Sequence, residues 1–543
     1  EALDKKTPLL RSMAAVSKQA VRVLQAMGNT TTTKVVSTVG PEQEYFLVDR
    51  DFYLDRLDLM LTGRTLFGAP APKGQELEDQ YFGSIKDRVS AYMTDLNQEL
   101  WKMGITSKTQ HNEVAPAQYE MAPIFATTNI ATDHNQLVME TMQKVALRHD
   151  LVCLLHEKPY AGINGSGKHN NWSLSTNDGM NLLKPGHTAS DNVQFLIFLA
   201  AMIKAVDTHA DILRATCASA GNDHRLGANE APPAIISIFM GEDLTDILEK
   251  IAKGEKLSTK DPQVLHVGVE TLPVIPKDNT DRNRTSPFAF TGDKFEFRMV
   301  GSAQSIAGAN VALNTIAAEA LDEIATRLEK AKDMTAEVAA IIKEIYKKHN
   351  RILFNGDNYS DAWVKEAEKR GLPNVRNSVD ALKAFVTPKA FALFEKYAVL
   401  SHKELHSRYE IYVETYAKQI NIEALTAIDM AKKQFLPAGI EYSTLLADSI
   451  ASLKGVGVPA PAQADLLKKV GAVVAATYKT LTKLEGAVSK AQKIDDTVKQ
   501  AEAYRDKVFP VMQALRGDID ALEMLVPAEL WPVPTYADLL FKL

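Results

Sequence analysis

Residues 164–173 read Asn-Gly-Ser-Gly-Lys-His-Asn-Asn-Trp-Ser, and this stretch is the most informative of the chain. With Gly162 it has the spacing G-x-x-x-x-G-K of a nucleotide P-loop, which requires Ser or Thr after the lysine and then a helix. His169 stands in the Ser/Thr position, poor helix formers follow it, and no apolar strand run precedes the loop. We therefore exclude a P-loop and expect a glycine-rich turn that presents a histidine and several backbone amides to a site.

Carboxylates occur at strand spacing in a second stretch, Gly40–Val48, which reads as a strand preceded by a turn. Because alternate side chains of a strand share a face, Glu42 and Glu44 are expected on one face, about 7 Å apart. Such a pair alone is more often a solvated strand face than a functional site. Whether Glu42 and Glu44 form part of a functional site depends on whether further acidic segments lie close to them.

Two further acidic segments are present. Glu113 and Glu120 frame a segment whose Pro116 argues against a helix, and no lysine or arginine lies between them. Residues 294–298 read Lys-Phe-Glu-Phe-Arg, and strand alternation places Glu296 between the two cationic side chains on one face. With His169, these carboxylates form a donor set that suits a hard divalent cation such as Mg²⁺ or Mn²⁺, whereas zinc favours thiolates or more histidines.

Arginines supply the complementary charge. Arg225 and Arg284 lie in polar segments rich in Gly, Asn and Pro, and arginine is the preferred partner of carboxylate and phosphate oxygens. Cations that bridge phosphates and arginines that neutralise them are the equipment of phosphoryl transfer. The alternative for each arginine alone is a weak surface ion pair.

Six motifs of the chain occur in the order found in glutamine synthetases, and the chain resembles that family. The motifs are G-P-E-x-E (40–44), E-V-x-P-A-Q-x-E (113–120), N-G-S-G-x-H (164–169), the run 225–232 that ends in E-A-P, N-R-[ST] (283–285) and E-x-R (296–298). Each motif is weak alone, but the ordered set is specific. The Lys-His-Asn-Asn-Trp run, the R-L-G-A-N-E-A-P-P run and the long C-terminal extension are most similar to the type III branch.

The resemblance implies an α+β fold, in which a curved antiparallel sheet with flanking helices is followed by an all-helical C-terminal extension. We expect a catalytic domain at residues 1–425 and the extension at 426–543, with the small N-terminal sheet domain of the family missing from the chain. The predicted elements are helices at 8–28, 87–103 and 191–219, a loop at 57–80, a break near Pro437 and Gly439, and two helices within 463–516.

The resemblance also implies a role for each matched residue. A first metal ion is expected at Glu44, Glu113 and Glu120, and a second at Glu42, His169 and Glu296. Substrate-binding residues are expected at Asn164, Gly165, Arg225, Arg298 and Tyr81, with Tyr81 lining the ammonium pocket. Nucleotide-binding residues are expected at Asn171, Ser173 and Arg284. Glu230 is expected to accept a proton from ammonium, and Arg284 to act with it in catalysis.

The implied activity is ATP-dependent ligation of ammonia to the γ-carboxyl of L-glutamate through γ-glutamyl phosphate, with Mg²⁺ or Mn²⁺ as cofactor. The alternatives are a γ-glutamyl ligase of the same fold that uses another amine, and a non-catalytic structural relative. One departure is Ala289, which stands where the family has a second phosphate-binding arginine; Lys294 or Arg282 are the candidate substitutes. The resemblance further implies a homo-oligomer, a dodecamer of two hexameric rings.

The composition agrees with these expectations. The 543 residues carry 62 Lys and Arg against 68 Asp and Glu, a net charge of −6, which indicates neither a nucleic-acid nor a membrane partner. Two cysteines in so long a chain suggest a reducing compartment. No apolar run reaches the roughly 18 residues of a membrane span. We therefore expect a cytoplasmic protein.

Overall fold

The computed structural model describes residues 2–186, 189–227, 231–255, 264–265, 275–276 and 284–543. Its main feature is a mostly antiparallel sheet in the order β2-β3-β1-β6-β11-β10-β7, in which β10 and β7 are the parallel pair. The long strand β1 also pairs with β4 and β5 at its two ends. The strands are β1 (Val35–Asp49), β2 (Ser107–Asn112), β3 (Gln118–Pro123), β4 (Ala126–Thr127), β5 (Leu151–Leu154), β6 (Lys168–Thr176), β7 (Ile238–Phe239), β10 (Phe288–Phe290) and β11 (Phe295–Phe297).

The strand register brings the acidic motifs together. Directly opposed residues are Glu44 and Glu120 on β1 and β3, Glu42 and His169 on β1 and β6, and Asn171 and Glu296 on β6 and β11. Opposed side chains in an antiparallel pair have Cβ atoms about 5 Å apart. Four segments that lie far apart in the sequence therefore place their polar side chains on one face of the sheet.

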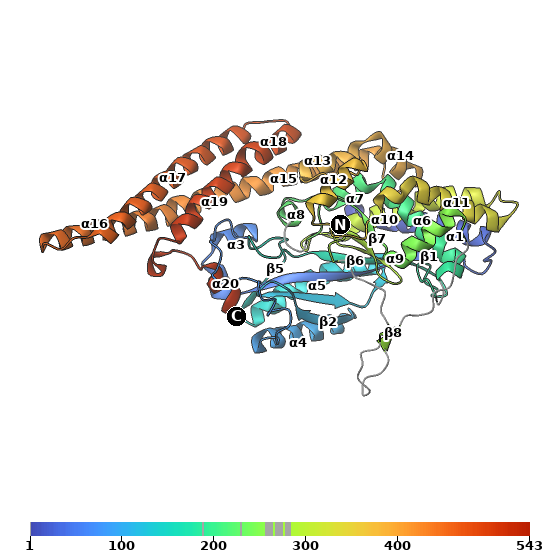
Figure 1. Ribbon diagram of the computed structural model, residues 1–543, viewed down its shortest axis with the longest axis horizontal. Helices are drawn as coiled ribbons and strands as arrows, with labels where there is room; N and C mark the ends of the chain where they lie inside the picture. Colours follow the sequence, from blue (N-terminus) through green and yellow to red (C-terminus); the bar gives the residue numbers. More distant parts are fainter. Residues whose placement is uncertain (1, 187–188, 228–230, 256–263, 266–274, 277–283) are drawn as a thin grey trace.

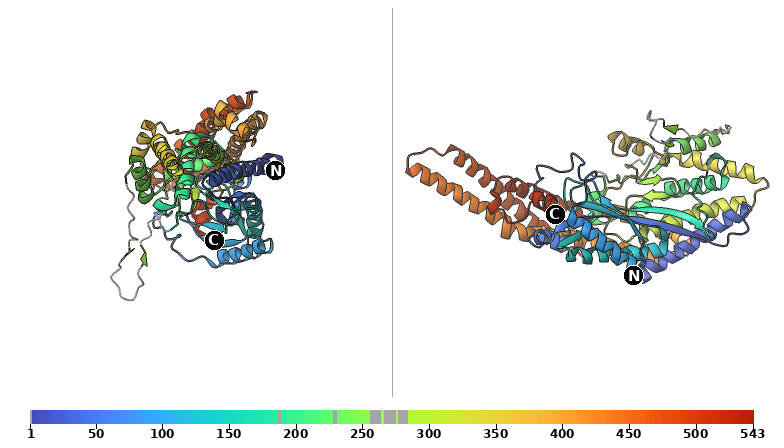
Figure 2. Two further views of the ribbon diagram at one scale, coloured as in Figure 1. Left: turned by 90° about the vertical axis from the view of Figure 1, so that its right-hand side faces the viewer. Right: turned by 90° about the horizontal axis from the view of Figure 1, so that it is seen from below.

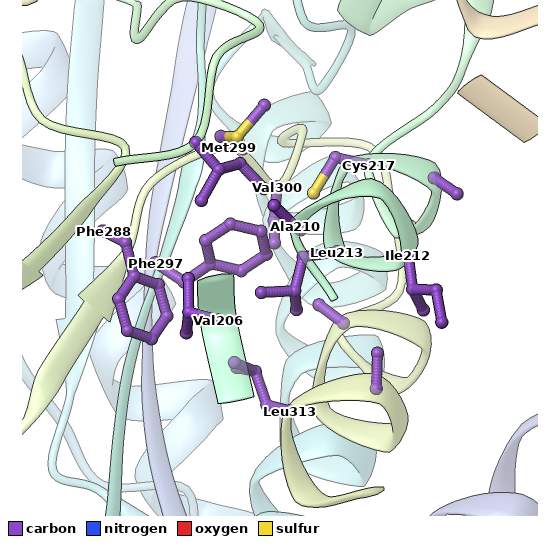
Figure 3. Close-up of a cluster of buried hydrophobic side chains, with 14 of the residues drawn as sticks. Val206, Ala210, Ile212, Leu213, Cys217, Phe288, Phe297, Met299, Val300 and Leu313 are labelled. Carbon is purple, nitrogen blue, oxygen red and sulfur yellow. The ribbon is translucent and has the colours of Figure 1, made fainter. Parts of the chain in front are cut away.

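The opposite face of the sheet is apolar and covered by helices. Trp172 of β6 and Phe295 and Phe297 of β11 belong to the main core, together with α1, α6, α7 and α10. Figure 3 shows Phe288, Phe297, Met299 and Val300 facing Val206, Leu213 and Leu313 of these helices. The helices are α1 (Thr7–Ala26), α6 (Val193–Thr208), α7 (Ala210–Thr216) and α10 (Ala307–Leu328).

The other half of β1 packs on a second pair of helices, α4 (Asp87–Lys102) and α5 (Thr128–Arg148). Tyr45 and Leu47 point into this cluster, whereas Phe46 and Val48 belong to a separate buried apolar cluster with Tyr160. The predicted helices at 8–28 and 87–103 are confirmed. The single helix predicted at 191–219 is wrong: His209 leaves the helical conformation between α6 and α7, and its ring is held by Glu319 of α10.

The C-terminal helices form a projecting arm (Figure 1, Figure 2). α15 (His402–Met430) continues through the π-helical turn η5 (Ala431–Phe435) into α16 (Leu436–Gly455), and α17 (Pro461–Ala491) packs back along α16. α18 (Thr497–Ala503), the π-helical turn η6 (Tyr504–Val508) and α19 (Phe509–Glu523) then lead to the short α20 (Tyr536–Phe541). The expected break near Pro437 is wrong, because Pro437 lies in the first turn of α16, directly after the wide turn η5.

Gly439 has a packing role rather than a breaking one. A Cβ atom at this position would lie 2.8 Å from Val474 of α17 and 3.0 Å from Leu522 of α19, so the glycine allows these helices to approach closely. The predicted pair of helices within 463–516 is present as α17 and the α18–α19 run. The division of the chain at residues 425 and 426 stays a prediction, and it falls within α15.

The expected loop at residues 57–80 begins instead with a short helix, α3 (Leu57–Thr62). The helix start is stabilised by Arg56 and Asp58, which form a fully buried ion pair, and Asp58 also accepts a hydrogen bond from the backbone N–H of Leu66. The expectation is therefore wrong for residues 57–62, and the remainder of the segment to residue 80 has no helix or strand. Within the described part of the chain, no helix is both long and apolar enough to cross a bilayer.

Candidate active site

The polar face of the sheet borders a cavity of about 560 Å³. It is lined by every predicted site residue that the structure describes: Glu42, Glu44, Tyr81, Glu113, Glu120, Asn164, Gly165, His169, Asn171, Ser173, Arg225, Arg284, Glu296 and Arg298. Glu230 lies outside the described residues, as does Arg282. Fourteen residues from seven sequence segments thus share one cavity, although their individual roles remain predictions.

His169 is the centre of one cluster. Its Nδ1 atom lies 3.2 Å from a carboxylate oxygen of Glu42 and 3.1 Å from one of Glu296. Burial disfavours the charge on this ring, but the hydrogen bonds with Glu296 and Glu42 outweigh it and raise the pKa of His169 well above its usual value. The three residues can offer ligand atoms within 4.8 Å of one another.

Two further side chains orient the carboxylates of this cluster. Asn171 donates a 2.8 Å hydrogen bond to Glu42. Arg298 donates two hydrogen bonds to Glu296, from Nε at 2.9 Å and from Nη2 at 3.0 Å. This is the strong two-point geometry of an arginine–carboxylate pair. Burial opposes ionisation of Glu296, yet His169 and Arg298 hold its pKa below the usual range.

The second cluster contains a histidine that the sequence analysis did not assign. His111 of β2 lies 3.0 Å from Glu120 and 3.6 Å from Glu113, and these three residues also offer ligand atoms within 4.8 Å. The signal for His111 was present in the sequence, since a histidine two residues before Glu113 can share its side of the chain. The expected third ligand, Glu44, lies between the clusters: its two oxygens are 3.5 Å from His169 and 2.7 Å from the Gly167 N–H.

The carboxylates of the second cluster repel one another. Burial, followed by the charges of Glu44 and Glu120, raises the pKa of Glu113 to about 9. The hydrogen bond with Glu120 raises the pKa of His111, also to about 9. A site that holds extra protons to relieve negative charge is well suited to a divalent cation, which would neutralise the same carboxylates. The donor set therefore fits a hard metal ion.

The glycine-rich turn behaves as expected. Lys168 begins β6 rather than a helix, and its buried Nζ donates to Asn135 at 2.9 Å, so the chain has no phosphate-binding P-loop here. A Cβ atom on Gly165 would lie 2.4 Å from the Glu157 carbonyl oxygen, and one on Gly167 would lie 2.2 Å from the guanidinium of Arg225. Both positions require glycine because the turn packs directly on these groups.

Arg225 is buried behind this turn, and its guanidinium donates hydrogen bonds to backbone carbonyl oxygens. Its guanidinium donates to the carbonyl oxygens of Arg298, Met299 and Val300 at 3.0–3.4 Å. Asn164, at the tip of the turn, exchanges two 3.0 Å hydrogen bonds with the side chain of Gln75. The turn is therefore connected both to the chain after β11 and to the segment that follows α3.

The remaining predicted residues also line the cavity. The guanidinium of Arg284 lies over the ring of Tyr81, 5.6 Å from its centre, and Tyr81 also meets His111 edge to face. Ser173 lies 2.8 Å from the carbonyl oxygen of Asp293. Lys294 lines the cavity, whereas Ala289 is buried in β10. Two carboxylate–histidine clusters and three arginines around one cavity fit the class of metal-dependent enzymes of phosphoryl transfer.

Comparison with known proteins identifies the family. Two descriptions match the chain, "Glutamine synthetase, catalytic domain" at residues 15–237 and "Glutamine synthetase C-terminal domain" at residues 337–454. The chain belongs to the glutamine synthetase family.

Three relatives match the whole length of the chain. The glutamine synthetase of Butyrivibrio fibrisolvens is 46% identical over 552 residues, which cover 100% of this chain and 78% of that protein. The type-3 glutamine synthetase of Dictyostelium discoideum is 45% identical, with 75% of that protein covered. The glutamine synthetase of Bacteroides fragilis is 42% identical, with 76% covered. The expected likeness to the type III branch is confirmed.

Proposed function

We propose that the chain ligates ammonia to the γ-carboxyl of L-glutamate at the expense of ATP and releases glutamine, ADP and phosphate. The observation that carries this proposal is the single cavity in which both carboxylate–histidine clusters meet Arg284 and Arg298. Full-length similarity to glutamine synthetases supports it. The γ-carboxylate first takes the γ-phosphoryl group of ATP, which gives it a leaving group, and ammonia then displaces phosphate.

The carboxylate clusters would hold two divalent cations, Mg²⁺ or Mn²⁺. Glu42, His169 and Glu296 fit one ion, and Glu113, Glu120 and Glu44 the other, with His111 as an additional donor beside them. The bound cations supply positive charge to the phosphate oxygens. Arg298 keeps Glu296 ionised and oriented, and Asn171 orients Glu42 through its hydrogen bond. These two residues would therefore fix the carboxylates of this metal site before a nucleotide binds.

The predicted glutamate-binding and nucleotide-binding residues form two groups. Asn164 and Gly165 would contact glutamate at the tip of the glycine-rich turn, with Arg298 as the cationic partner of the substrate. Arg225 is held by three carbonyl oxygens, which supports a role in shaping the turn beside any contact with glutamate. Asn171, Ser173 and Arg284 would bind the nucleotide, and Lys294 is the described candidate for the missing second arginine.

Ammonium requires a negative, enclosed pocket and a proton acceptor, because it becomes a nucleophile only after losing a proton. Tyr81, packed between Arg284 and His111, would line that pocket. Glu230 is the proposed proton acceptor on the basis of its motif. Exclusion of water protects the acyl phosphate from hydrolysis until ammonia attacks.

A coupled assay of purified protein tests this function. Phosphate release and glutamine formation should occur in equal amounts, should require glutamate, ATP and ammonia together, and should stop when EDTA removes divalent cations. Methylamine and other small amines, offered in place of ammonia, test the alternative acceptor. Phosphate release without glutamine, or a clear preference for another amine, would overturn the proposal.

We further propose a cytoplasmic homo-oligomer built as two hexameric rings. The family resemblance supports the assembly, and so do apolar side chains exposed along the helical arm, among them Ile440, Leu445, Val456 and Val458. Both cysteines of the chain, Cys153 and Cys217, are buried and free, which is consistent with a reducing compartment.

A further inference from the structure

The last helix, α20, begins beside the glycine-rich turn. Tyr536 begins α20, and its ring packs edge to face against Tyr160, 5.5 Å between centres. Both rings belong to a cluster with Phe46 and Val48 of β1. By strand alternation these two residues share the face of β1 that carries Glu42 and Glu44. The C-terminal segment thus lies on the catalytic face of the sheet, although the arm itself projects away from it (Figure 1).

The hydroxyl of Tyr536 has three hydrogen-bond partners. It accepts from the backbone N–H of Ala161 at 2.9 Å and from Arg516 at 2.8 Å. It lies 2.7 Å from the Thr65 hydroxyl, which itself donates to the Pro159 carbonyl oxygen at 2.8 Å, so Tyr536 donates to Thr65. The hydroxyl, buried with its side chain, therefore uses its one donor and both acceptor sites.

Arg516 and its neighbours on α19 hold the segment that leads to the cavity. The guanidinium of Arg516 donates to the carbonyl oxygens of Thr65 and Gly68 at 3.2 and 3.1 Å. Asp520 accepts from the Gly68 N–H at 2.7 Å. The same segment continues to Gln75, which pairs with Asn164, and to Tyr81, which meets Arg284.

The turn of residues 159–165, which Tyr536 contacts, has few other contacts that could hold its outer end in place. Ala161 and Gly162 are exposed, and Gly162 adopts a φ of +81°, so little packing restrains the turn at its outer end. Two residues further on, Asn164 and Gly165 line the cavity. A displacement of Ala161 would therefore also displace Asn164 and Gly165, the proposed glutamate contacts, because only a short segment separates them.

We propose that Tyr536 is a positioning residue, which holds the turn of residues 159–165 in place for glutamate through its bonds to Ala161 and Thr65. Arg516 orients the Tyr536 hydroxyl for this task. The proposal rests on the proposed function of the cavity. It assigns the C-terminal helices a part in substrate binding, beyond any part in assembly.

Tyr536→Phe tests the proposal, because it keeps the ring and removes only the hydroxyl. The matched control is Tyr504→Phe, whose hydroxyl bonds Asn421 at 2.8 Å within the C-terminal helices. We expect Tyr536→Phe to raise the KM for glutamate roughly tenfold, the scale of one or two lost hydrogen bonds, with the KM for ATP nearly unchanged. Tyr504→Phe should leave both constants as in the wild type.

Amide hydrogen exchange gives a second readout that does not depend on activity. Peptides that cover residues 157–167 should exchange faster in Tyr536→Phe and at the wild-type rate in Tyr504→Phe. Unchanged exchange together with an unchanged KM for glutamate would overturn the proposal, and so would equal effects of the two variants. Faster exchange in a protein whose wild type makes no glutamine would confirm the tether and overturn the function instead.

Discussion

His169 shows how one side chain depends on three strands. Its ring reaches Glu42 and Glu296 with one nitrogen and Glu44 with the other, and each contact comes from a residue on a neighbouring strand. The strand register creates this arrangement. We therefore expect a substitution of His169 to leave the fold in place while this cluster loses its nitrogen ligand. A substitution of His169 therefore tests metal binding without a change of the fold.

We expect His169→Ala to lower glutamine formation by about 100-fold or more, because the cation of this cluster loses one of its three protein ligands. The stabilisation of the protein by Mn²⁺, measured as a shift of Tm, should shrink as well. His406→Ala is the control, since His406 is half-exposed on α15, away from the cavity. Near-wild-type activity of the His169 variant at saturating ATP and metal would contradict the assignment.

Glu113 offers a prediction about pH. Its pKa of about 9, against an ordinary value of 4.5, means that the folded protein keeps a proton that the unfolded chain has lost. Stability in EDTA therefore falls as the pH rises through this window, because the folded state binds more protons. Glu113→Gln removes the titration, so its advantage in Tm over the wild type should grow from pH 6 to pH 9.

The control for this prediction is Glu410→Gln, at an exposed position of α15, which should follow the wild type at each pH. In saturating Mn²⁺ the order should reverse, because the glutamine variant lacks a ligand while the wild type gains the cation. An advantage of Glu113→Gln that stays constant with pH would show that repulsion at Glu113 does not limit the stability of the metal-free protein.

At the scale of elements, the strands and the long C-terminal helices follow different rules. The alternation of β1 was predictable, since side-chain direction on a strand is set by local geometry. The continuous run from α15 to α16 was not, because a proline and a glycine usually mark a break. Pro437 is accommodated because it lies in the first turn of α16, directly after the π-helical turn η5. Gly439 is accommodated because α17 and α19 approach closely there.

Two helix glycines give a matched test of this packing. Gly471→Ala, where an added Cβ meets no atom within 4 Å, should stabilise the protein by about 0.5–1 kcal/mol through helix propensity. Gly439→Ala should lose that gain or destabilise by about 1 kcal/mol or more, because the Cβ meets Val474 and Leu522. Urea denaturation measures both, and equal stabilisation by the two variants would contradict the close-packing explanation.

At the scale of the whole molecule, the C-terminal helices are joined to the catalytic part by buried polar contacts. Arg64 and Glu423 form a buried two-point ion pair between the segment after α3 and α15, with distances of 2.9 and 2.6 Å. Such a pair is strongly destabilising to break from one side, since it leaves a buried charge. The arm is therefore anchored to the catalytic part of the molecule by buried polar contacts.

The turn between α16 and α17 carries the test of assembly. Val456 and Val458 are 75% and 46% exposed, and a carboxylate on either would resist burial in an apolar contact. We expect the double variant Val456→Glu, Val458→Glu to give a smaller particle in light scattering, with the monomer still folded by circular dichroism. Ser489→Glu, at an exposed position on α17, is the control for added charge. An unchanged particle would show that this turn makes no contact between subunits.

The sequence by itself determined which reactive side chains are present and in which direction neighbouring side chains of a strand point. Residue types and spacing were sufficient for the Glu42–Glu44 face and for the rejection of the P-loop at Lys168. Both features depend on neighbours along the chain, whose directions follow from backbone geometry. The family, and the α+β class that it implies, came from the resemblance of six ordered motifs to those of glutamine synthetases. The tertiary structure confirms the shared face of Glu42 and Glu44 and the strand that follows Lys168, and the full-length relatives confirm the family.

Only the tertiary structure decided which distant segments meet. It placed His111 opposite Glu120 through the pairing of β2 with β3, and it placed Glu44 between His169 and the Gly167 N–H. It also enclosed Arg225 in carbonyl oxygens and brought Tyr536 to Ala161. The physical reason is that strand register and helix docking are set by the packing of the whole core. Contacts between segments that are distant in the sequence, such as Tyr536 with Ala161 at a separation of 375 positions, have no local pattern from which they could be predicted.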